Sequence, residues 1–161
     1  VEATAAQYEA DTDRLQLHVQ NVAQDIPAFT EITEETLFER VRQIFLYSLH
    51  NESISRFRRM MTIEQFRSPE LAEFYSRRYV DRVLAYHAGI FRALIAAGEI
   101  RESDPDTLSM LYVAPVLTLI GICDRQPERE AACLQKLEAH VRLFYRTFQA
   151  DRNERSEDDE P

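Results

Sequence analysis

Glycine is scarce in this sequence. The 161 residues contain three glycines, and none precedes Gly89. A β-rich fold needs turns that bear glycine at short intervals. The scarcity therefore argues against sheets and for long helices. The length suggests one domain that can bury a core of its own.

Cysteine and positive charge are also limited. Cys123 and Cys133 are the only two cysteines, too few for a disulfide framework, so we expect free buried thiols in a reducing cytosol. The formal net charge is −9, whereas a protein that binds nucleic acid needs a basic face. The N-terminus shows neither the basic region nor the apolar run of a signal peptide. The sequence predicts a cytoplasmic chain that does not itself contact DNA.

Motifs of catalysis and metal binding are missing as well. No HExxH, CxxC, P-loop or GxGxxG pattern occurs. Ferritin-like di-iron sites need a glutamate three residues before an inward-facing histidine, and none of the 4 histidines has one there. We therefore expect no catalytic residue, no metal site and no cofactor.

Start and stop signals divide the chain into six expected helices. Ser68-Pro69 and Asp104-Pro105 each place a capping side chain before a proline at the first helical position. Gly98 is expected to close a helix in the left-handed conformation. Within the longest helix the apolar stripe slips in phase between residues 77 and 79, so we expect a kink there. The six helices are expected over residues 2–24, from a cap at Thr30 or Thr33 to 49, from Asn51 or Ser53 to 66, and over 69–97, 105–123 and 127–148.

The uncharged stretch at residues 108–123 organises this all-α fold. It is apolar on all sides, and such a helix must be buried on all sides. It is shorter than the about 20 residues of a membrane span, so we expect no membrane insertion. Either one side packs against a second copy of the chain, or it is the central helix of a six-helix bundle. The domain is expected over residues 1–150, and the acidic tail, residues 151–161, is expected to be disordered.

The last two helices form a predicted hairpin that can build a homodimer. Two such hairpins around a two-fold axis give a dimeric four-helix bundle. The residues predicted at this interface are Met110, Val113, Leu117, Ile120, Leu134, Leu137, Val141 and Phe144.

Aromatic residues and methionine are frequent on the middle helices. Ligand sites between helices are mostly apolar and carry a few polar groups, which predicts a small apolar or amphipathic ligand here. An aromatic stripe at helical spacing equally describes an ordinary core, in which Glu64 and His87 are satisfied by neighbours. The candidate ligand-binding residues are Phe45, Met61, Glu64, Phe66, Tyr79, Tyr86, His87, Phe91 and Tyr112.

Arginines cluster at positions 56, 58 and 59. They could bind an anionic effector. The favoured interpretation is a solvated face whose arginines pair with Glu64, Glu70 and Glu73.

Two stretches carry a family resemblance. The run FRRMMTIEQFRSPELAEFY, residues 57–75, has basic residues that open a helix, a glutamate near its end, and Pro-Glu-Leu-Ala at the start of the next helix. In LIAAGEIRESDPDTLSMLY, residues 94–112, a glycine cap precedes an Ile-Arg pair and an Asp-Pro start. Together they resemble the effector domain of tetracycline-repressor-type (TetR/AcrR) transcriptional regulators, over residues 1–148.

This resemblance implies a function. Regulators of this family have N-terminal helices that bind DNA, followed by a helical domain that binds a small effector and dimerises. Residues 2–24 would be the connecting helix and residues 104–148 the dimer hairpin, while DNA would be bound only through a helix-turn-helix domain that is absent here. An effector that prefers one helix arrangement shifts the population toward it, and the two DNA-binding domains then lose their match to successive half-sites.

Two other functions stay open. One is a free-standing helical dimerisation and interaction module. The other is a small helical enzyme or a carrier of apolar ligands. A bound apolar ligand favours the regulator or the carrier, whereas a helix-turn-helix sequence upstream favours the regulator alone.

Overall fold

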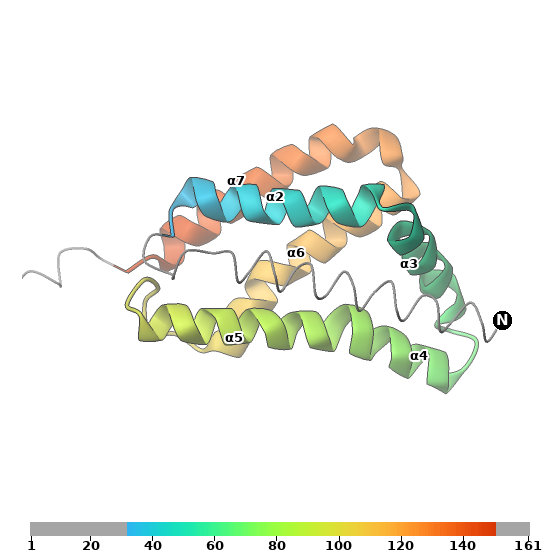
Figure 1. Ribbon diagram of the computed structural model, residues 1–161, viewed down its shortest axis with the longest axis horizontal. Helices are drawn as coiled ribbons and strands as arrows, with labels where there is room; N and C mark the ends of the chain where they lie inside the picture. Colours follow the sequence, from blue (N-terminus) through green and yellow to red (C-terminus); the bar gives the residue numbers. More distant parts are fainter. Residues whose placement is uncertain (1–31, 151–161) are drawn as a thin grey trace, which may run out of the picture.

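The computed structural model describes residues 32–150, and nearly all of them lie in helices (Figure 1). The predicted helix at residues 2–24 and the predicted acidic tail at residues 151–161 lie outside this range. The other five expected helices are confirmed, and with them the all-α class. The elements are α2 (Glu34–His50), α3 (Glu52–Glu64), α4 (Pro69–Ser76), the π-helical turn η1 (Arg77–Asp81), α5 (Arg82–Ala96), α6 (Pro105–Arg125), the 3-10 turn η2 (Pro127–Arg129) and α7 (Glu130–Phe148).

Side-chain caps fix the helix starts where the sequence predicts them. Ser68 Oγ accepts a hydrogen bond from the amide of Leu71 at 3.3 Å, directly before the proline that opens α4. Three further caps accept a bond from the amide three residues ahead, which satisfies a donor that the first helical turn leaves unpaired. These caps are Thr33 before α2, Asn51 before α3 and Asp104 before α6.

Gly98 ends α5 as predicted. Its φ of 70° lies in the left-handed region that glycine adopts without a steric penalty. In this conformation the amide of Gly98 donates to the carbonyl of Ile95 at 2.9 Å, and the amide of Glu99 donates to the carbonyl of Leu94 at 3.0 Å. These bonds satisfy carbonyls at the helix end and turn the chain toward α6.

A π-helical turn joins α4 to α5 at the predicted phase slip. The amide of Arg82 donates to the carbonyl of Arg77, five residues earlier, instead of four. One residue is thereby added to the turn. The slip in the apolar stripe is absorbed in this way, and Figure 1 shows α4 and α5 as one long helical body.

Helix α6 is the central helix of the single chain. It contacts α2, α5 and α7, and it crosses behind α2 and α5 in Figure 1. By length and hydropathy it would pass as a membrane span, but this is weak evidence, because a core helix passes the same test. One side of α6 is buried in the chain's own core, whereas Met110 and Leu111 are 51% and 49% exposed. Its buried residues are Leu108, Ser109, Tyr112, Val113, Val116, Leu119, Ile120 and Cys123.

The chain is tied together where α5 and α7 end. Ile100 and Gln149 form an isolated antiparallel bridge. The amide of Arg101 donates to the carbonyl of Phe148 at 2.9 Å, and the amide of Ala150 donates to the carbonyl of Glu99 at 3.0 Å. This backbone tie holds the α5–α6 loop against the end of α7.

Candidate functional site

Helices α5, α6 and α7 bring a group of aromatic rings together inside the bundle. The ring of Tyr112 on α6 lies 5.6 Å from His87 and 5.5 Å from Phe91, both on α5. Across the core it lies 5.1 Å from Phe144 on α7, and Tyr86 lies 5.3 Å from His87. These are centroid distances in the range of favourable ring contacts. We call these five residues the aromatic cluster.

His87 is a neutral member of the aromatic cluster. Its Nδ1 lies 2.8 Å from the carbonyl oxygen of Val83, so Nδ1 carries the proton and donates it. Burial lowers the pKa of the His87 imidazole, and the bond to Val83 opposes this only in part. The ring therefore stays uncharged near neutral pH, and Nε2 remains an acceptor.

The two tyrosines of the aromatic cluster keep their hydroxyl protons. Burial raises the pKa of Tyr112, which is fully enclosed, and it also raises the pKa of the more exposed Tyr86. Both phenols are therefore hydrogen-bond donors over the whole physiological range. Neither hydroxyl forms a hydrogen bond with another residue of the described chain.

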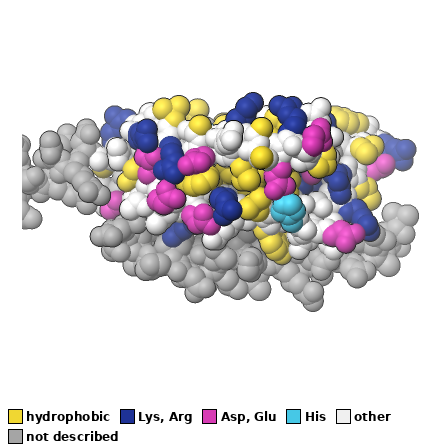
Figure 2. All heavy atoms as spheres, turned by 90° about the horizontal axis from the view of Figure 1, so that it is seen from above, with side chains coloured by type: hydrophobic (Ala, Val, Ile, Leu, Met, Phe, Trp, Pro, Cys, Tyr) yellow, Lys and Arg dark blue, Asp and Glu magenta, His cyan; other side chains and the backbone are white. Residues whose placement is uncertain are grey.

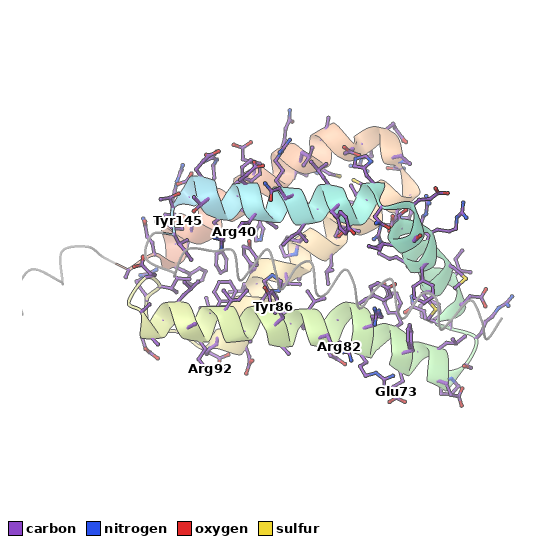
Figure 3. All side chains as sticks on the ribbon, in the orientation of Figure 1. Arg40, Glu73, Arg82, Tyr86, Arg92 and Tyr145 are labelled. Carbon is purple, nitrogen blue, oxygen red and sulfur yellow. The ribbon has the colours of Figure 1, made fainter. Side chains whose placement is uncertain are left out.

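Arg40 on α2 faces the same tyrosines. Its positive charge partly offsets the rise in the pKa of Tyr86 and of Tyr112, so it lies within electrostatic range of both. Figure 3 shows Arg40 extending from α2, and Tyr86 from α5, toward the space between the two helices. Arg40 is half-buried and makes no ion pair or hydrogen bond within residues 32–150.

A second polar site joins α3 to α6. Arg58 donates from Nε and Nη2 to the two carboxylate oxygens of Asp124, at 2.6 and 2.7 Å, and from Nη1 to the carbonyl of Ser48 at 2.9 Å. Burial raises the pKa of the adjacent Tyr79 to about 12, although the charges of Arg78 and Arg58 oppose it. Because this bidentate pair is satisfied by the protein, it acts as a structural link between the helices.

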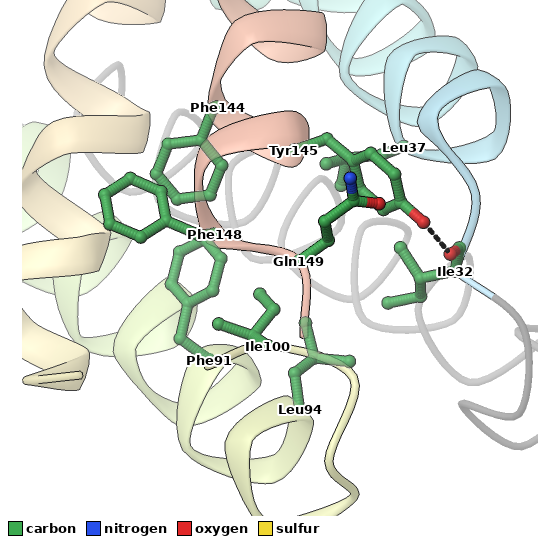
Figure 4. Close-up of a pocket in the computed structure, with 9 residues that line it drawn as sticks. All are labelled: Ile32, Leu37, Phe91, Leu94, Ile100, Phe144, Tyr145, Phe148 and Gln149. Carbon is green, nitrogen blue, oxygen red and sulfur yellow. Dashed lines mark hydrogen bonds between the residues drawn. The ribbon is translucent and has the colours of Figure 1, made fainter. Parts of the chain in front are cut away.

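A small cavity lies beside the aromatic cluster at the backbone tie (Figure 4). Its volume of about 10 Å³ is close to the minimum for one water molecule. A ligand can bind there only if side chains move. The lining residues are Ile32, Leu37, Phe91, Leu94, Ile100, Phe144, Tyr145, Phe148 and Gln149.

Charged side chains of both signs share the surface of α2 and α7. Arg142 pairs with Glu34 at 3.0 Å, Glu35 at 2.9 Å and Glu138 at 2.7 Å, and Arg146 also pairs with Glu34 at 2.8 Å. Figure 2, which views the molecule from above, shows basic and acidic side chains interspersed over this face. Within residues 32–150, no group of three His, Cys, Asp or Glu side chains is placed to hold a metal ion.

Comparison with known families identifies the domain. The model of the C-terminal domain of AefR-like transcriptional repressors, a TetR-type domain, matches residues 35–150. The chain belongs to the TetR family. Its members are regulators rather than enzymes, and they act as dimers that bind small effectors and DNA.

A solved structure supports the same fold. A protein from Mesorhizobium loti MAFF303099, assigned as a TetR-family transcriptional regulator, matches with a TM-score of 0.69 and 16% sequence identity. The match covers 92% of this chain and 73% of that protein. At this identity the likeness shows the fold alone. A search of curated proteins finds no match.

The structure separates the nine predicted ligand-binding residues of this TetR domain. Tyr86, His87, Phe91 and Tyr112 meet in the aromatic cluster. Phe45 is fully buried in the main core. The other four, Met61, Glu64, Phe66 and Tyr79, belong to α3, the residues after it and η1, and do not join the aromatic cluster.

Two of those four face away from any enclosed site. Phe66 lies beyond the end of α3 and is 86% exposed. Glu64 pairs with Arg67 at 3.0 Å on the surface.

The sequence analysis did not predict Arg40 as a site residue. Arg40 stands three residues after Leu37 and four before Ile44, and this spacing places it beside the apolar stripe of α2.

Most residues predicted at the dimer interface face the chain's own core instead. Val113, Ile120, Leu137, Val141 and Phe144 are at most 8% exposed within a single chain. The chain's own helices cover these side chains. Leu117 and Leu134 are half-buried, and Met110 is half-exposed.

The accessible apolar surface of the hairpin includes one predicted position, Met110, and two that were not predicted. Leu111 is 49% exposed and Met110 is 51% exposed on α6, and Leu143 is 68% exposed on α7. We call these three residues the outer apolar face. Helical spacing could not separate it from the inner face, because α6 is apolar on both sides.

Proposed function

We propose that this TetR domain senses a small organic effector and joins two copies of the chain, and that effector binding changes the DNA affinity of an N-terminal helix-turn-helix. The observation that carries the proposal is the aromatic cluster, which combines apolar rings with two hydroxyls that make no hydrogen bond within residues 32–150, in the regulatory domain of a repressor family. Such a mixture of apolar walls and few polar groups is typical of ligand sites. The protein acts in the cytoplasm and catalyses no reaction.

The closed packing supplies a mechanism for the proposed switch. Because the cavity beside the aromatic cluster has a volume of only about 10 Å³, an effector must separate rings that now touch. An effector therefore binds a more open arrangement of α5, α6 and α7 and shifts the population toward it. The helices that carry the DNA-binding domains then change their separation in the dimer.

We assign the dimer contact to the outer apolar face. Exposed apolar side chains on α6 and α7 gain about 25 cal/mol per Å² when a second copy covers them. Two hairpins that meet through this face form a four-helix bundle. The half-buried Leu117 and Leu134 complete the edge of this contact.

A charged substitution on the outer apolar face tests the dimer. We expect Leu143→Glu to convert a dimer of about twice 18.8 kDa into a folded monomer, measured by light scattering after gel filtration and by circular dichroism. The matched control is Phe66→Glu, since Phe66 is also exposed but lies outside the hairpin. A dimer that survives Leu143→Glu, or a monomeric wild type, contradicts the assignment.

DNA binding is tested with protein expressed from the complete reading frame. We expect the mass of this protein, measured by mass spectrometry, to exceed 18.8 kDa. In an electrophoretic mobility shift assay, we expect it to bind a DNA fragment from the region upstream of its own gene and to release this DNA when an effector is added. An intact mass of 18.8 kDa without DNA binding would instead support the interaction module.

A further inference from the structure

Arg40 makes no ion pair or hydrogen bond within residues 32–150, in contrast to three other arginines that are at least partly buried. Arg58 binds Asp124 in the core, and Arg142 binds three glutamates. Even Arg42, two residues along α2 and similarly half-buried, pairs with Glu39 at 3.1 Å. A half-buried guanidinium beside an apolar stripe can bind an anion that is not part of the chain.

The groups around Arg40 are suited to hold that anion. Tyr86 and Tyr112 lie within range of its charge, from α5 and α6 respectively. Neither hydroxyl is hydrogen-bonded within residues 32–150. Three helices thus present a cation and two neutral donors, and the acceptor Nε2 of His87 lies in the same cluster. No carboxylate of the described chain pairs with Arg40.

The surroundings also restrict the rest of the ligand. The ring of Tyr112 packs against the rings of Phe91 and Phe144, which line the small apolar cavity. A ligand that enters from the Arg40 side meets apolar walls beyond its charged end. One guanidinium with two neutral donors matches a single carboxylate, which accepts two parallel bonds from arginine. A second negative charge on the ligand would have no further cation to bind among these groups.

We propose that the effector is an amphipathic monoanion, an organic carboxylate with an aromatic or alkyl body, whose carboxylate binds Arg40 and the hydroxyls of Tyr86 and Tyr112. The aromatic or alkyl part of the ligand packs between rings of the aromatic cluster and replaces contacts that these rings now make with one another. The assignment rests on the proposed effector-sensing function and names the chemical class of the ligand. It also places α2, the first described helix of the domain, in direct contact with the ligand.

Pairs of probes that differ only in charge test this assignment. The full chain is titrated with benzoate, phenylacetate and octanoate and with their neutral amides, by ligand-observed NMR and calorimetry. We expect at least one carboxylate to bind, and its amide to bind about tenfold more weakly or worse, as a lost hydrogen bond to a charged group predicts. Arg40→Gln should reduce carboxylate binding by a similar factor.

Matched variants separate the local contact from general electrostatics. Arg42→Gln removes the same charge two residues away and should leave binding within about twofold, because Arg42 already pairs with Glu39. Tyr86→Phe deletes one donor and should weaken binding by about three- to tenfold. Circular dichroism confirms that each variant is folded.

Two results overturn the assignment, and they are distinguishable. Equal binding of a carboxylate by wild type and Arg40→Gln, or a preference for the amides, rejects the carboxylate site but leaves effector sensing intact. Absence of binding by every carboxylate and every amide rejects the site and removes support for the effector-sensing function as well.

Discussion

Replacing Asp124 by asparagine removes the charge that neutralises Arg58 inside the bundle. The two side chains are only 11% and 12% exposed, and their bidentate contacts are 2.6 and 2.7 Å long. A buried guanidinium that loses its counter-ion keeps its desolvation cost without the attraction that offsets it. We therefore expect Asp124→Asn to be among the most destabilising polar substitutions in the domain.

The magnitude follows from the burial of the pair. Breaking a buried ion pair by removing one partner costs about 3–5 kcal/mol. For a chain of this length, each kcal/mol lowers the melting temperature by about 2–4 °C, so we expect a decrease of roughly 6–20 °C. The double variant Arg58→Met with Asp124→Leu should recover most of this loss, because apolar replacements of buried pairs are often neutral.

Calorimetry or thermal circular dichroism at one fixed protein concentration measures these changes, since dimerisation makes the melting temperature depend on concentration. The matched control is Glu52→Gln on α3, the helix that carries Arg58. Its partner Arg56 lies at 2.7 Å, but the two side chains are 68% and 80% exposed. The control should cost less than about 1 kcal/mol. If Asp124→Asn destabilises no more than Glu52→Gln, burial does not determine the strength of this link.

Two further substitutions have effects whose sign the structure fixes. Gly98→Ala should lower the free energy of unfolding by about 1–2 kcal/mol in chemical denaturation, because φ is 70° at this position. Gly89→Ala should raise it by about 0.5–1 kcal/mol, because Gly89 lies inside α5 and nothing lies within 4 Å of an added Cβ. The same sign for both substitutions would refute the backbone argument. Because burial lowers the pKa of His87 below its ordinary 6.5, the unfolded chain binds its proton more tightly, so stability falls as pH falls below about 6.5. His87→Phe should flatten this decline, and parallel curves for wild type and variant would show that His87 does not contribute to it.

Much of the fold could be predicted because its signals are local. Ser68-Pro69 and Asp104-Pro105 specify helix starts within four residues of sequence, and Gly98 specifies a helix end by its φ alone. The phase slip near Arg77 was visible for the same reason. A π turn is one way to insert a residue into a helix, and the apolar pattern records the insertion but not its hydrogen bonds.

The site was less predictable because it depends on contacts between distant segments. The arginines at 56, 58 and 59 form one cluster in the sequence, yet Arg58 turns inward to Asp124, 66 residues away, while Arg56 pairs with Glu52 on the surface. Helical spacing also groups Leu137 with the interface, although its side chain is fully buried in the chain's own core. Which face of an all-apolar hairpin turns inward is decided by the other helices.

The backbone tie at Ile100 and Gln149 fixes the C-terminal end of α5 against α7. Its hydrogen bonds link the loop after α5 to the end of α7, so the two helices separate there only by breaking several bonds together. At the opposite end α5 continues into the π turn at Arg77–Asp81, where the regular ladder of bonds is already interrupted. When an effector displaces α5, we expect the helix to pivot about its C-terminal end, so that a small displacement at the aromatic cluster grows along its length toward α4 and α3.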